Sequence, residues 1–314
     1  MPSLKQDWHL TRSSLCSNMT DRQPHRPEVL AFLQREFQQA AWEFALPHGR
    51  GNETYFARSS RLACFVKIGV QIPRYEAAAV LGITPPVLAS GYLEDGTSIL
   101  VQPFIPSSTP TRKDFQNNLP QCADILHRTH HSPEIQALLP PTGSDRYRDA
   151  GLAALDGIQN RWGKYREQVP EAAVFVDESL ESLAQQVGQF EGTGLVASHN
   201  DICNANWLIT PEGQIYLVDL ELMALDDPAM DTGALLWWYY PPSLRQRFLE
   251  IAGYANDEGF RLRMQVRMAL HCLSITLPRE HSFDPFDPAS FAQELTDFRA
   301  ILAGEENPQG YADG

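Results

Sequence analysis

Residues 195–209 decide the fold and read Leu-Val-Ala-Ser-His-Asn-Asp-Ile-Cys-Asn-Ala-Asn-Trp-Leu-Ile. Two apolar runs flank a polar segment of the form His-x-Asp-x4-Asn, a pattern that predicts a loop between two buried strands. A third apolar run, at 215–218, ends in Asp219. We therefore expect Asp201, Asn206 and Asp219 at strand ends, where their side chains can converge.

These three side chains offer only carboxylate and amide oxygens. Oxygen ligands of this kind are the ones that Mg²⁺ prefers, together with the oxygens of bound phosphates. The polar pattern continues with Glu221 and then with Asp227-Pro228-Ala229-Met230-Asp231. The segment thus predicts a magnesium site that can also receive phosphate groups.

The order of these residues resembles the catalytic and metal-binding loops of the aminoglycoside phosphotransferase and choline kinase family, distant relatives of the protein kinases. The family pattern is His-x-Asp-x4-Asn, then a hydrophobic strand ending in Asp-x-Glu, then Asp-Pro-x-x-Asp. The resemblance extends roughly over residues 44–240 and is sharpest at 195–231. The matching positions are His199, Asp201, Asn206, Asp219, Glu221, Asp227, Pro228 and Asp231.

The resemblance implies a two-lobed, protein-kinase-like α+β fold and an enzyme that uses Mg²⁺ and ATP, or GTP, to phosphorylate a hydroxyl group of a small molecule. Asp201 would accept or orient the proton of the attacking hydroxyl, while Asn206 and Asp219 would hold Mg²⁺ against the phosphates. His199 and Asp231 would keep the loop in shape by hydrogen bonding. Asp219 is followed by Leu-Glu rather than Phe-Gly, and no Ala-Pro-Glu segment follows, so we do not expect a protein kinase.

The rest of the chain fits two lobes of unequal size. A polar extension over 1–25 precedes a β-rich N-lobe over 26–104, and a mainly helical C-lobe occupies 105–314 after a hinge that begins at Pro103. Within the N-lobe, the patterns predict a first helix from Pro27 to about Phe44, and a short helix from Arg74 to Leu81. The predicted strands lie at 44–46, 54–58, 62–68, 85–92 and 98–103. The helices predicted for the C-lobe lie near 114–131, 144–168, 171–189, 233–256 and 258–275.

Candidate nucleotide-binding residues lie in the N-lobe. Lys67 is on an apolar strand; in the resembled family the equivalent lysine contacts the α- and β-phosphates and pairs with a glutamate, here Glu76. The loop at 48–54 resembles the family's phosphate-covering loop, and an ordinary hairpin turn is the alternative. Its candidate residues are Gly49, Gly51 and Asn52. By position, the linker beside the adenine would contain Val101, Gln102 and Phe104.

The acceptor is expected beside the aromatic and acidic residues that follow Asp219. Aromatic faces attract ammonium groups through cation–π contacts of about 0.5–2 kcal/mol. We therefore expect a cationic acceptor, either an amino alcohol of the choline or ethanolamine type or an aminoglycoside; a sugar, homoserine or thiamine is the alternative. The aromatic residues at 237–240 are consecutive, so in a helix their side chains point in all directions around the axis. The same run therefore also fits a helix whose aromatic side chains are packed in the core. The candidate residues are Glu221, Asp227, Trp237, Trp238 and Tyr240.

Composition excludes several classes of partner. The chain has 25 Lys and Arg against 39 Asp and Glu, a formal charge of −14, whereas nucleic acids and anionic membranes require clustered cations. No apolar run reaches the roughly 18–20 residues of a membrane span, and the first residues contain no apolar signal segment, so we expect a cytoplasmic protein. Cys203 fits packing, and the histidines of 127–131 fit a helix end rather than a metal site. The rival hypothesis is a kinase-like module that binds nucleotide without catalysis, which the retention of Lys67, Asp201, Asn206 and Asp219 disfavours.

Overall fold

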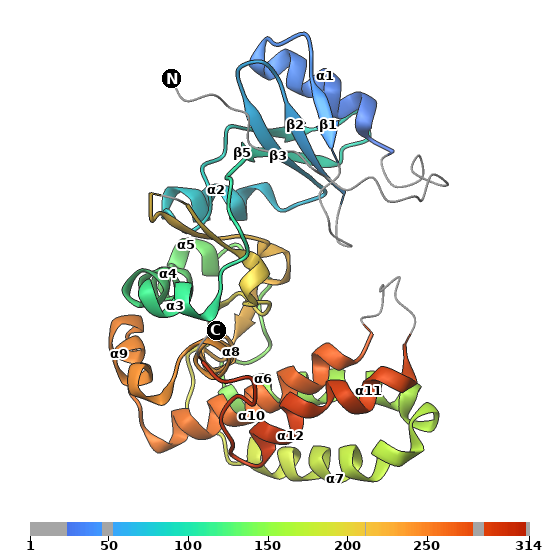
Figure 1. The fold of residues 1–314 in the computed structure, drawn as a ribbon, viewed down its shortest axis with the longest axis vertical. Coiled ribbons are helices and arrows are strands. Elements are labelled where there is room, and N and C mark those ends of the chain that lie inside the picture. Colours follow the sequence, from blue (N-terminus) through green and yellow to red (C-terminus); the bar gives the residue numbers. More distant parts are fainter. Residues whose placement is uncertain (1–23, 46–52, 211, 279–285, 312–314) are drawn as a thin grey trace.

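The structure is a computed structural model that describes residues 24–45, 53–210, 212–278 and 286–311. Figure 1 shows a smaller lobe built on a sheet, at the top, and a larger lobe dominated by helices below it. The predicted two-lobed α+β architecture is confirmed. Residues 1–23, most of the predicted extension, and Gly49, Gly51 and Asn52 of the predicted phosphate-covering loop lie outside the described residues.

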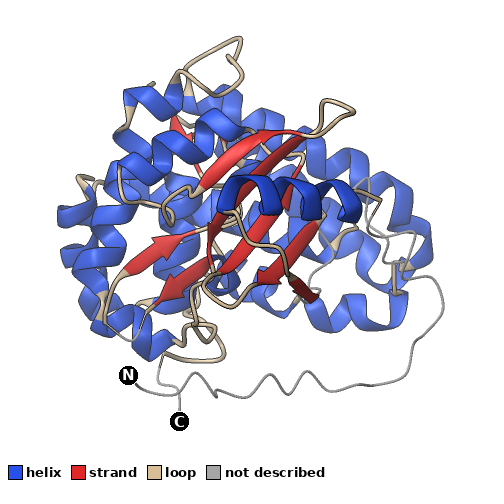
Figure 2. Ribbon diagram, turned by 90° about the horizontal axis from the view of Figure 1, so that it is seen from above, coloured by secondary structure: helices blue, strands red, loops and turns tan. Residues whose placement is uncertain are grey.

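The smaller lobe is a five-stranded antiparallel sheet in the order β1-β2-β3-β5-β4. Its strands are β1 (Glu43–Ala45), β2 (Thr54–Arg58), β3 (Ala63–Ile68), β4 (Ala89–Tyr92) and β5 (Ser98–Pro103). Alternate residues of β2 and β3, such as Tyr55 and Val66, are buried with Val29, Phe32 and Leu33 of α1 (Arg26–Phe37). Figure 2 shows α1 lying across this face of the sheet. The opposite face presents the next residues along each strand, among them Lys67.

Helix α2 (Ile72–Val80) follows β3 but belongs by its contacts to the larger lobe. Its buried residues Ile72, Tyr75 and Ala78 join the hydrophobic cluster of the C-lobe, separate from the one under α1. The helix begins two residues before the predicted start at Arg74. Its buried face therefore runs through Ile72, Tyr75 and Ala78 at a spacing of three residues, which is the spacing of one helical face.

The larger lobe is mainly helical, and two of its predicted helices are divided. The prediction of one helix over 233–256 is wrong, because Pro241 and Pro242 hold Tyr240 in an extended conformation (φ −122°, ψ 122°) and start a new helix. The helix predicted over 114–131 is likewise split at Asn118. The helices are α3 (Arg112–Asn117), α4 (Leu119–His131), α5 (Pro133–Gln136), α6 (Tyr147–Tyr165), α7 (Pro170–Val187), α8 (Ala229–Tyr239), α9 (Pro242–Ala252), α10 (Glu258–Thr276), α11 (Pro288–Glu294) and α12 (Thr296–Leu302).

Two short antiparallel strand pairs flank the His-x-Asp-x4-Asn motif of residues 199–206. One pairs β6 (Val196–Ser198) with β9 (Ala224–Asp226), and the other pairs β7 (Trp207–Ile209) with β8 (Ile215–Leu217). The polar segment 199–206 therefore lies between β6 and β7, and Asp219 lies just after β8. None of the helices in the described parts of the chain is both long and apolar enough to cross a bilayer.

A glycine allows α8 to lie close against α10. A Cβ atom at Gly233 of α8 would lie 2.9 Å from the backbone oxygen of Met264 in α10, closer than real Cβ atoms approach oxygen. By contrast, a Cβ atom at Gly157 of α6 would meet no atom within 4 Å. The close crossing of α8 and α10 thus requires glycine at position 233.

We expect Gly233→Ala to lower the free energy of unfolding by about 1–3 kcal/mol, because the two helices must move apart to admit the methyl group. The control Gly157→Ala should raise it by about 0.5–1 kcal/mol, because alanine costs less backbone entropy in a helix. Urea unfolding of both variants measures the difference. Equal stability of the two variants would contradict the role of Gly233.

Candidate active site

A buried carboxylate organises the loop between β6 and β7. Asp231, in the first turn of α8, has no solvent exposure. Its Oδ2 accepts hydrogen bonds from the backbone N of His199 (2.6 Å) and from Nε2 of His130 on α4 (3.0 Å). Its Oδ1 accepts from the backbone N of Asn200 (2.9 Å). Asn200 adopts a left-handed conformation (φ 62°), which turns two successive N–H groups toward Asp231.

These contacts determine the charge of Asp231. Burial alone would raise the pKa of its carboxyl, but the hydrogen bond from His130, the charges of His130 and His199 and the backbone N–H of His199 outweigh burial and lower the pKa to about 2. The role of His130 was not predicted, because its partner lies 101 positions away in the chain. Asp231 therefore carries a buried negative charge inside the larger lobe.

Further hydrogen bonds join the loop to the strand that carries Asp219. His199 Nε2 lies 2.9 Å from the carbonyl oxygen of Val218, and the backbone N of Val218 donates to the carbonyl of Asn206 (2.9 Å). Asn206 Nδ2 donates to the carbonyl of Asp201 (2.6 Å). The structure thus brings Asp201, Asn206 and Asp219 into one hydrogen-bonded unit. Asp219 itself is left-handed (φ 67°), a conformation that aspartate tolerates better than most residues.

The N-lobe contributes Lys67 to the same place. Lys67 is 5% exposed, and its Nζ lies 2.8 Å from Asp219 Oδ1 and 2.8 Å from Glu221 Oε1. Nζ also donates to the hydroxyl of Tyr75 on α2 (2.8 Å). The predicted pairing of Lys67 with Glu76 is wrong: Glu76 is exposed and accepts a hydrogen bond from Ser90 Oγ (2.9 Å).

The charges of this cluster follow from its burial and contacts. Burial lowers the pKa of Lys67, but the neighbouring Tyr75, Glu221 and Asp219 more than offset it, so Lys67 is a cation. Burial raises the pKa of Asp219, yet its hydrogen bond with Glu221 and the charge of Lys67 bring it to about 2. For Glu221, burial and the hydrogen bond with Asp219 raise the pKa. Glu221, predicted as an acceptor ligand, is thus a partner of Lys67 instead.

The face of the sheet opposite α1 is aromatic next to Lys67. Phe56 and Phe65 lie 5.3 Å apart between ring centroids, and Phe104 meets Phe56 edge-on at 5.2 Å. The sequence analysis did not single out Phe56 and Phe65, although they occupy the alternate positions of β2 and β3 that face away from α1. Val101 is fully buried under α1. The side chain of Gln102 is also buried, and its Nε2 donates to the carbonyl of Pro85 (2.6 Å). Only Phe104 of the predicted linker joins this aromatic surface.

The donor set suits Mg²⁺. The amide nitrogen of Asn206 donates to the backbone carbonyl of Asp201, which leaves the amide oxygen of Asn206 as a candidate metal ligand. The side chain of Asp219 is 52% exposed. Within the described ranges, no three His, Cys, Asp or Glu side chains group as a metal cage. One carboxylate and one amide oxygen match the way Mg²⁺ binds, since it keeps waters and shares substrate phosphates.

A hollow of about 500 Å³ opens beside the loop 199–206. Its walls come from the loop, the start of α3, the end of α8 and the C-terminal segment, and comprise Thr109, Pro110, Thr111, Arg112, Cys203, Asn204, Trp238, Tyr239 and Gln309. The hydroxyl of Tyr239 accepts from the backbone N of Asn204 (2.9 Å), and its ring stacks on Phe115. Tyr239 was not predicted as an acceptor ligand, because the aromatic run does not reveal which rings line the hollow.

The other acceptor candidates are structural. Trp237 and Tyr240 are buried in the core, where Trp237 Nε1 donates to the carbonyl of Glu305 and the Tyr240 hydroxyl to that of Phe115. Their prediction as acceptor ligands is therefore wrong, and the alternative of helix core holds for both. Asp227 is also fully buried; it lies 3.0 Å from Arg263 and accepts from the backbone N of Ala229.

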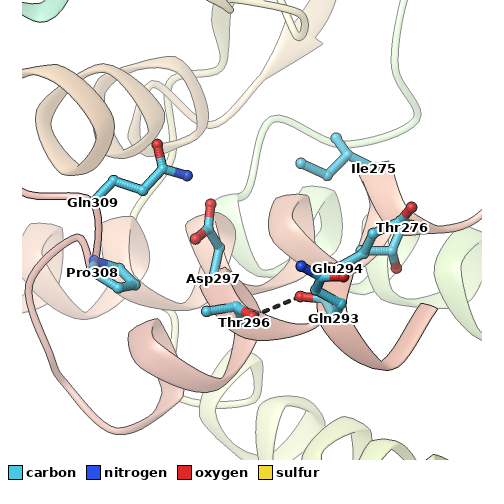
Figure 3. A pocket seen from close by; sticks show the side chains of 8 residues that line it. All are labelled: Ile275, Thr276, Gln293, Glu294, Thr296, Asp297, Pro308 and Gln309. Carbon is cyan, nitrogen blue, oxygen red and sulfur yellow. Dashed lines mark hydrogen bonds between the residues drawn. The ribbon is translucent and has the colours of Figure 1, made fainter. Parts of the chain in front are cut away.

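A second hollow, of about 540 Å³, shares Gln309 with the first. It lies among the end of α10, helices α11 and α12 and the C-terminal segment, and Figure 3 shows the side chain of Gln309 reaching toward Asp297. Asp297 and Glu294 bring negative charge to this hollow. Asp297 Oδ2 accepts from Trp238 Nε1 (3.2 Å), so the acidic hollow begins behind the indole that lines the first one.

Comparisons with known proteins concern the family and the fold of the chain. A family described as "Phosphotransferase enzyme family" matches residues 44–263. The fold is similar to a choline/ethanolamine kinase family protein from Mesorhizobium loti (18% identity, TM-score 0.63, covering 92% of this chain and 96% of that one). It is also similar to choline kinase from Cryptosporidium parvum (13%, 0.60, 88% and 96%) and to spectinomycin phosphotransferase APH(9)-Ia in complex with ADP and spectinomycin (15%, 0.54, 86% and 98%).

We expect Asp231→Asn to lower the free energy of unfolding at pH 7 by about 2–4 kcal/mol, because the amide cannot accept all three hydrogen bonds. A lowered pKa stabilises the fold above the unfolded-state pKa, and the stabilisation is lost as the pH falls toward about 2. The deficit of the variant should therefore narrow below pH 4. Urea unfolding between pH 3 and pH 7 measures it.

Asp124→Asn is the matched control, because Asp124 is 55% exposed and pairs with Arg128 on the surface of α4. Its effect should stay within about 0.5 kcal/mol. If Asp231→Asn cost no more than this control, Asp231 would not organise the loop.

Proposed function

The chain belongs to the phosphotransferase enzyme family, which matches residues 44–263, and from this premise we propose that it transfers the γ-phosphoryl group of ATP, or GTP, to a hydroxyl of a small molecule. The observation that carries the proposal is the convergence of Lys67 with Asp219 (2.8 Å) across the two lobes, next to the loop that bears Asp201 and Asn206. A cytoplasmic location, where nucleoside triphosphates are available, is part of the proposal.

Asp201 is the proposed catalytic residue. Phosphoryl transfer requires an aligned hydroxyl and neutralised phosphates more than covalent help from the protein. The carboxylate of Asp201 would orient the acceptor hydroxyl and accept its proton, and the loop contacts to Asp231 and Val218 support it. Rigid support matters, because small displacements of a reacting group cost large factors in rate.

Lys67 and the oxygens of Asn206 and Asp219 are the proposed phosphate side of the site. Lys67 would bind the α- and β-phosphates, and the aromatic surface of Phe56, Phe65 and Phe104 would contact the base. Asn206 and Asp219 would hold Mg²⁺, which neutralises phosphate charge when bound. The complexes of APH(9)-Ia with AMP and with ADP support a nucleotide in this fold.

A singly charged amino alcohol is the proposed acceptor. Trp238 and Tyr239 offer π faces in the hollow beside the catalytic loop, and the carboxylate of Asp297 lies behind the Trp238 indole. Arg112 brings a positive charge to the wall of the same hollow, where its Nε donates to the carbonyl of Trp238 (2.9 Å). Like charges repel, so each further ammonium group of a ligand adds to the repulsion by Arg112, and this wall favours one ammonium group over the several of an aminoglycoside.

We expect Asp201→Asn to lower kcat by about 10²–10⁴-fold, because the amide cannot accept the hydroxyl proton, while Mg–ATP binding stays nearly unchanged. An ADP-release assay with Mg–ATP measures turnover on choline, ethanolamine, aminoglycosides, thiamine, homoserine and simple sugars. Asp124→Asn, on the surface of α4, is the control. ATP binding without turnover on any acceptor would favour the non-catalytic module, and wild-type turnover in Asp201→Asn would refute its role.

Trp238→Leu should raise the KM of a cationic acceptor about 2- to 30-fold, the equivalent of one cation–π contact, and leave the KM of ATP unchanged. Initial rates at varied acceptor concentration measure the effect. Tyr92→Leu removes an aromatic ring that is 68% exposed on β4 and serves as the control. An unchanged acceptor KM in Trp238→Leu would place the acceptor elsewhere.

A further inference from the structure

The hydroxyl of Tyr75 is the centre of the contacts between α2 and the active site. It accepts hydrogen bonds from Lys67 Nζ (2.8 Å) and from the backbone N of Leu220 (3.1 Å), and it donates to Glu221, whose two carboxylate oxygens both lie at 2.9 Å. Tyr75 is 1% exposed. A phenol has one donor hydrogen and acceptor lone pairs, so these contacts use its full capacity.

This position requires a group that both donates and accepts. A carboxylate accepts only, so a glutamate here would face Glu221 with like charge and no hydrogen between them. A phenol avoids this conflict, because it accepts from the Lys67 cation on one side and donates to Glu221 on the other. Glu76, the next residue of α2, points away to Ser90.

Arg74 also joins α2 to the segment that follows Asp219. Its Nη1 donates to the carbonyl of Leu220 (2.8 Å) and lies 3.3 Å from that of Glu221. Arg74 is 7% exposed, and Ile72 and Ala78 fix the rotation of the helix in the core of the C-lobe. Two successive residues of α2 therefore hold Lys67 and the segment that follows Asp219 in one arrangement.

We propose that Tyr75, supported by Arg74, is the positioning residue that holds Lys67 for the phosphates of the nucleotide. Lys67 Nζ has three oxygen partners, and Tyr75 and Glu221 keep it in place when a phosphate oxygen replaces Asp219 as the third. The inference rests on the proposed function and deepens it, because it assigns to Tyr75 and Glu221 the anchoring of Lys67 that the sequence pattern assigns to Glu76.

The test compares the binding of a phosphate-bearing ligand with that of its nucleoside. Competition against a fluorescent ADP analogue gives Kd values for Mg–ADP and for adenosine in the wild type and in Tyr75→Phe, which keeps the buried ring. We expect Tyr75→Phe to weaken Mg–ADP about 10-fold and adenosine less than about twofold, since only phosphates contact Lys67. The KM for ATP should rise with the Kd, with a smaller change in kcat.

Three further variants make the result decisive. Tyr92→Phe removes an exposed hydroxyl and Glu76→Gln alters the neighbour of Tyr75, and both should bind Mg–ADP as the wild type does. Arg74→Met should show the same selective loss as Tyr75→Phe, and it tests the proposal if Tyr75→Phe does not fold.

Several outcomes would overturn the proposal. Equal losses for Mg–ADP and adenosine would show that Tyr75 only supports the fold, and unchanged Mg–ADP binding would show that it does not position Lys67. A selective loss in Glu76→Gln instead would return the role to Glu76. If the wild type bound neither ligand, the proposed function itself would fail and this inference with it.

Discussion

The burial of one charge, the carboxylate of Asp231, is the constraint on which the active site depends. An ionised carboxylate inside a protein costs several kcal/mol unless donors surround it. Here the donors are the backbone N–H groups of His199 and Asn200 and the imidazole of His130. Their convergence turns Asn200 into a left-handed conformation and brings the following residue, Asp201, to the end of the turn. Helix α4, helix α8 and the catalytic loop are thereby held in one geometry.

A second polar cluster joins this loop to the N-lobe. Lys67 comes from the sheet, Tyr75 and Arg74 come from α2, and all three contact residues 219–221. The side-chain nitrogen of Lys67 lies 2.8 Å from a carboxylate oxygen of Asp219 and 2.8 Å from one of Glu221, so ion pairs join the sheet to the segment after β8. Because α2 packs in the core of the C-lobe rather than under α1, this cluster is tied to the larger lobe.

The two hollows of the larger lobe differ in charge. Arg112 lines the first hollow, whereas Glu294 and Asp297 line the second, and Trp238 touches both regions through its ring and its indole N–H. Proteins of similar fold include choline kinases and spectinomycin phosphotransferase. In this chain the walls of the two hollows and the cluster around Lys67 come from different elements.

The resemblance of residues 195–231 to a known family implied the two lobes. The sequence by itself predicted the α+β class, from a β-rich part followed by a helical part, and the residues that converge after β6 and β8, from the apolar runs beside them. It could not determine the partner of Lys67, since successive helical residues point about 100° apart and only packing sets the rotation of α2. The spacing of Ile72, Tyr75 and Ala78 indicates which face of α2 is buried, but only when the helix is known to begin at Ile72. Likewise, four consecutive aromatic residues look alike in sequence. Tertiary structure alone placed Trp237 and Tyr240 in the core and Trp238 and Tyr239 in the wall of the first hollow, because the packing of α8 against its neighbours decides which side chains line that hollow.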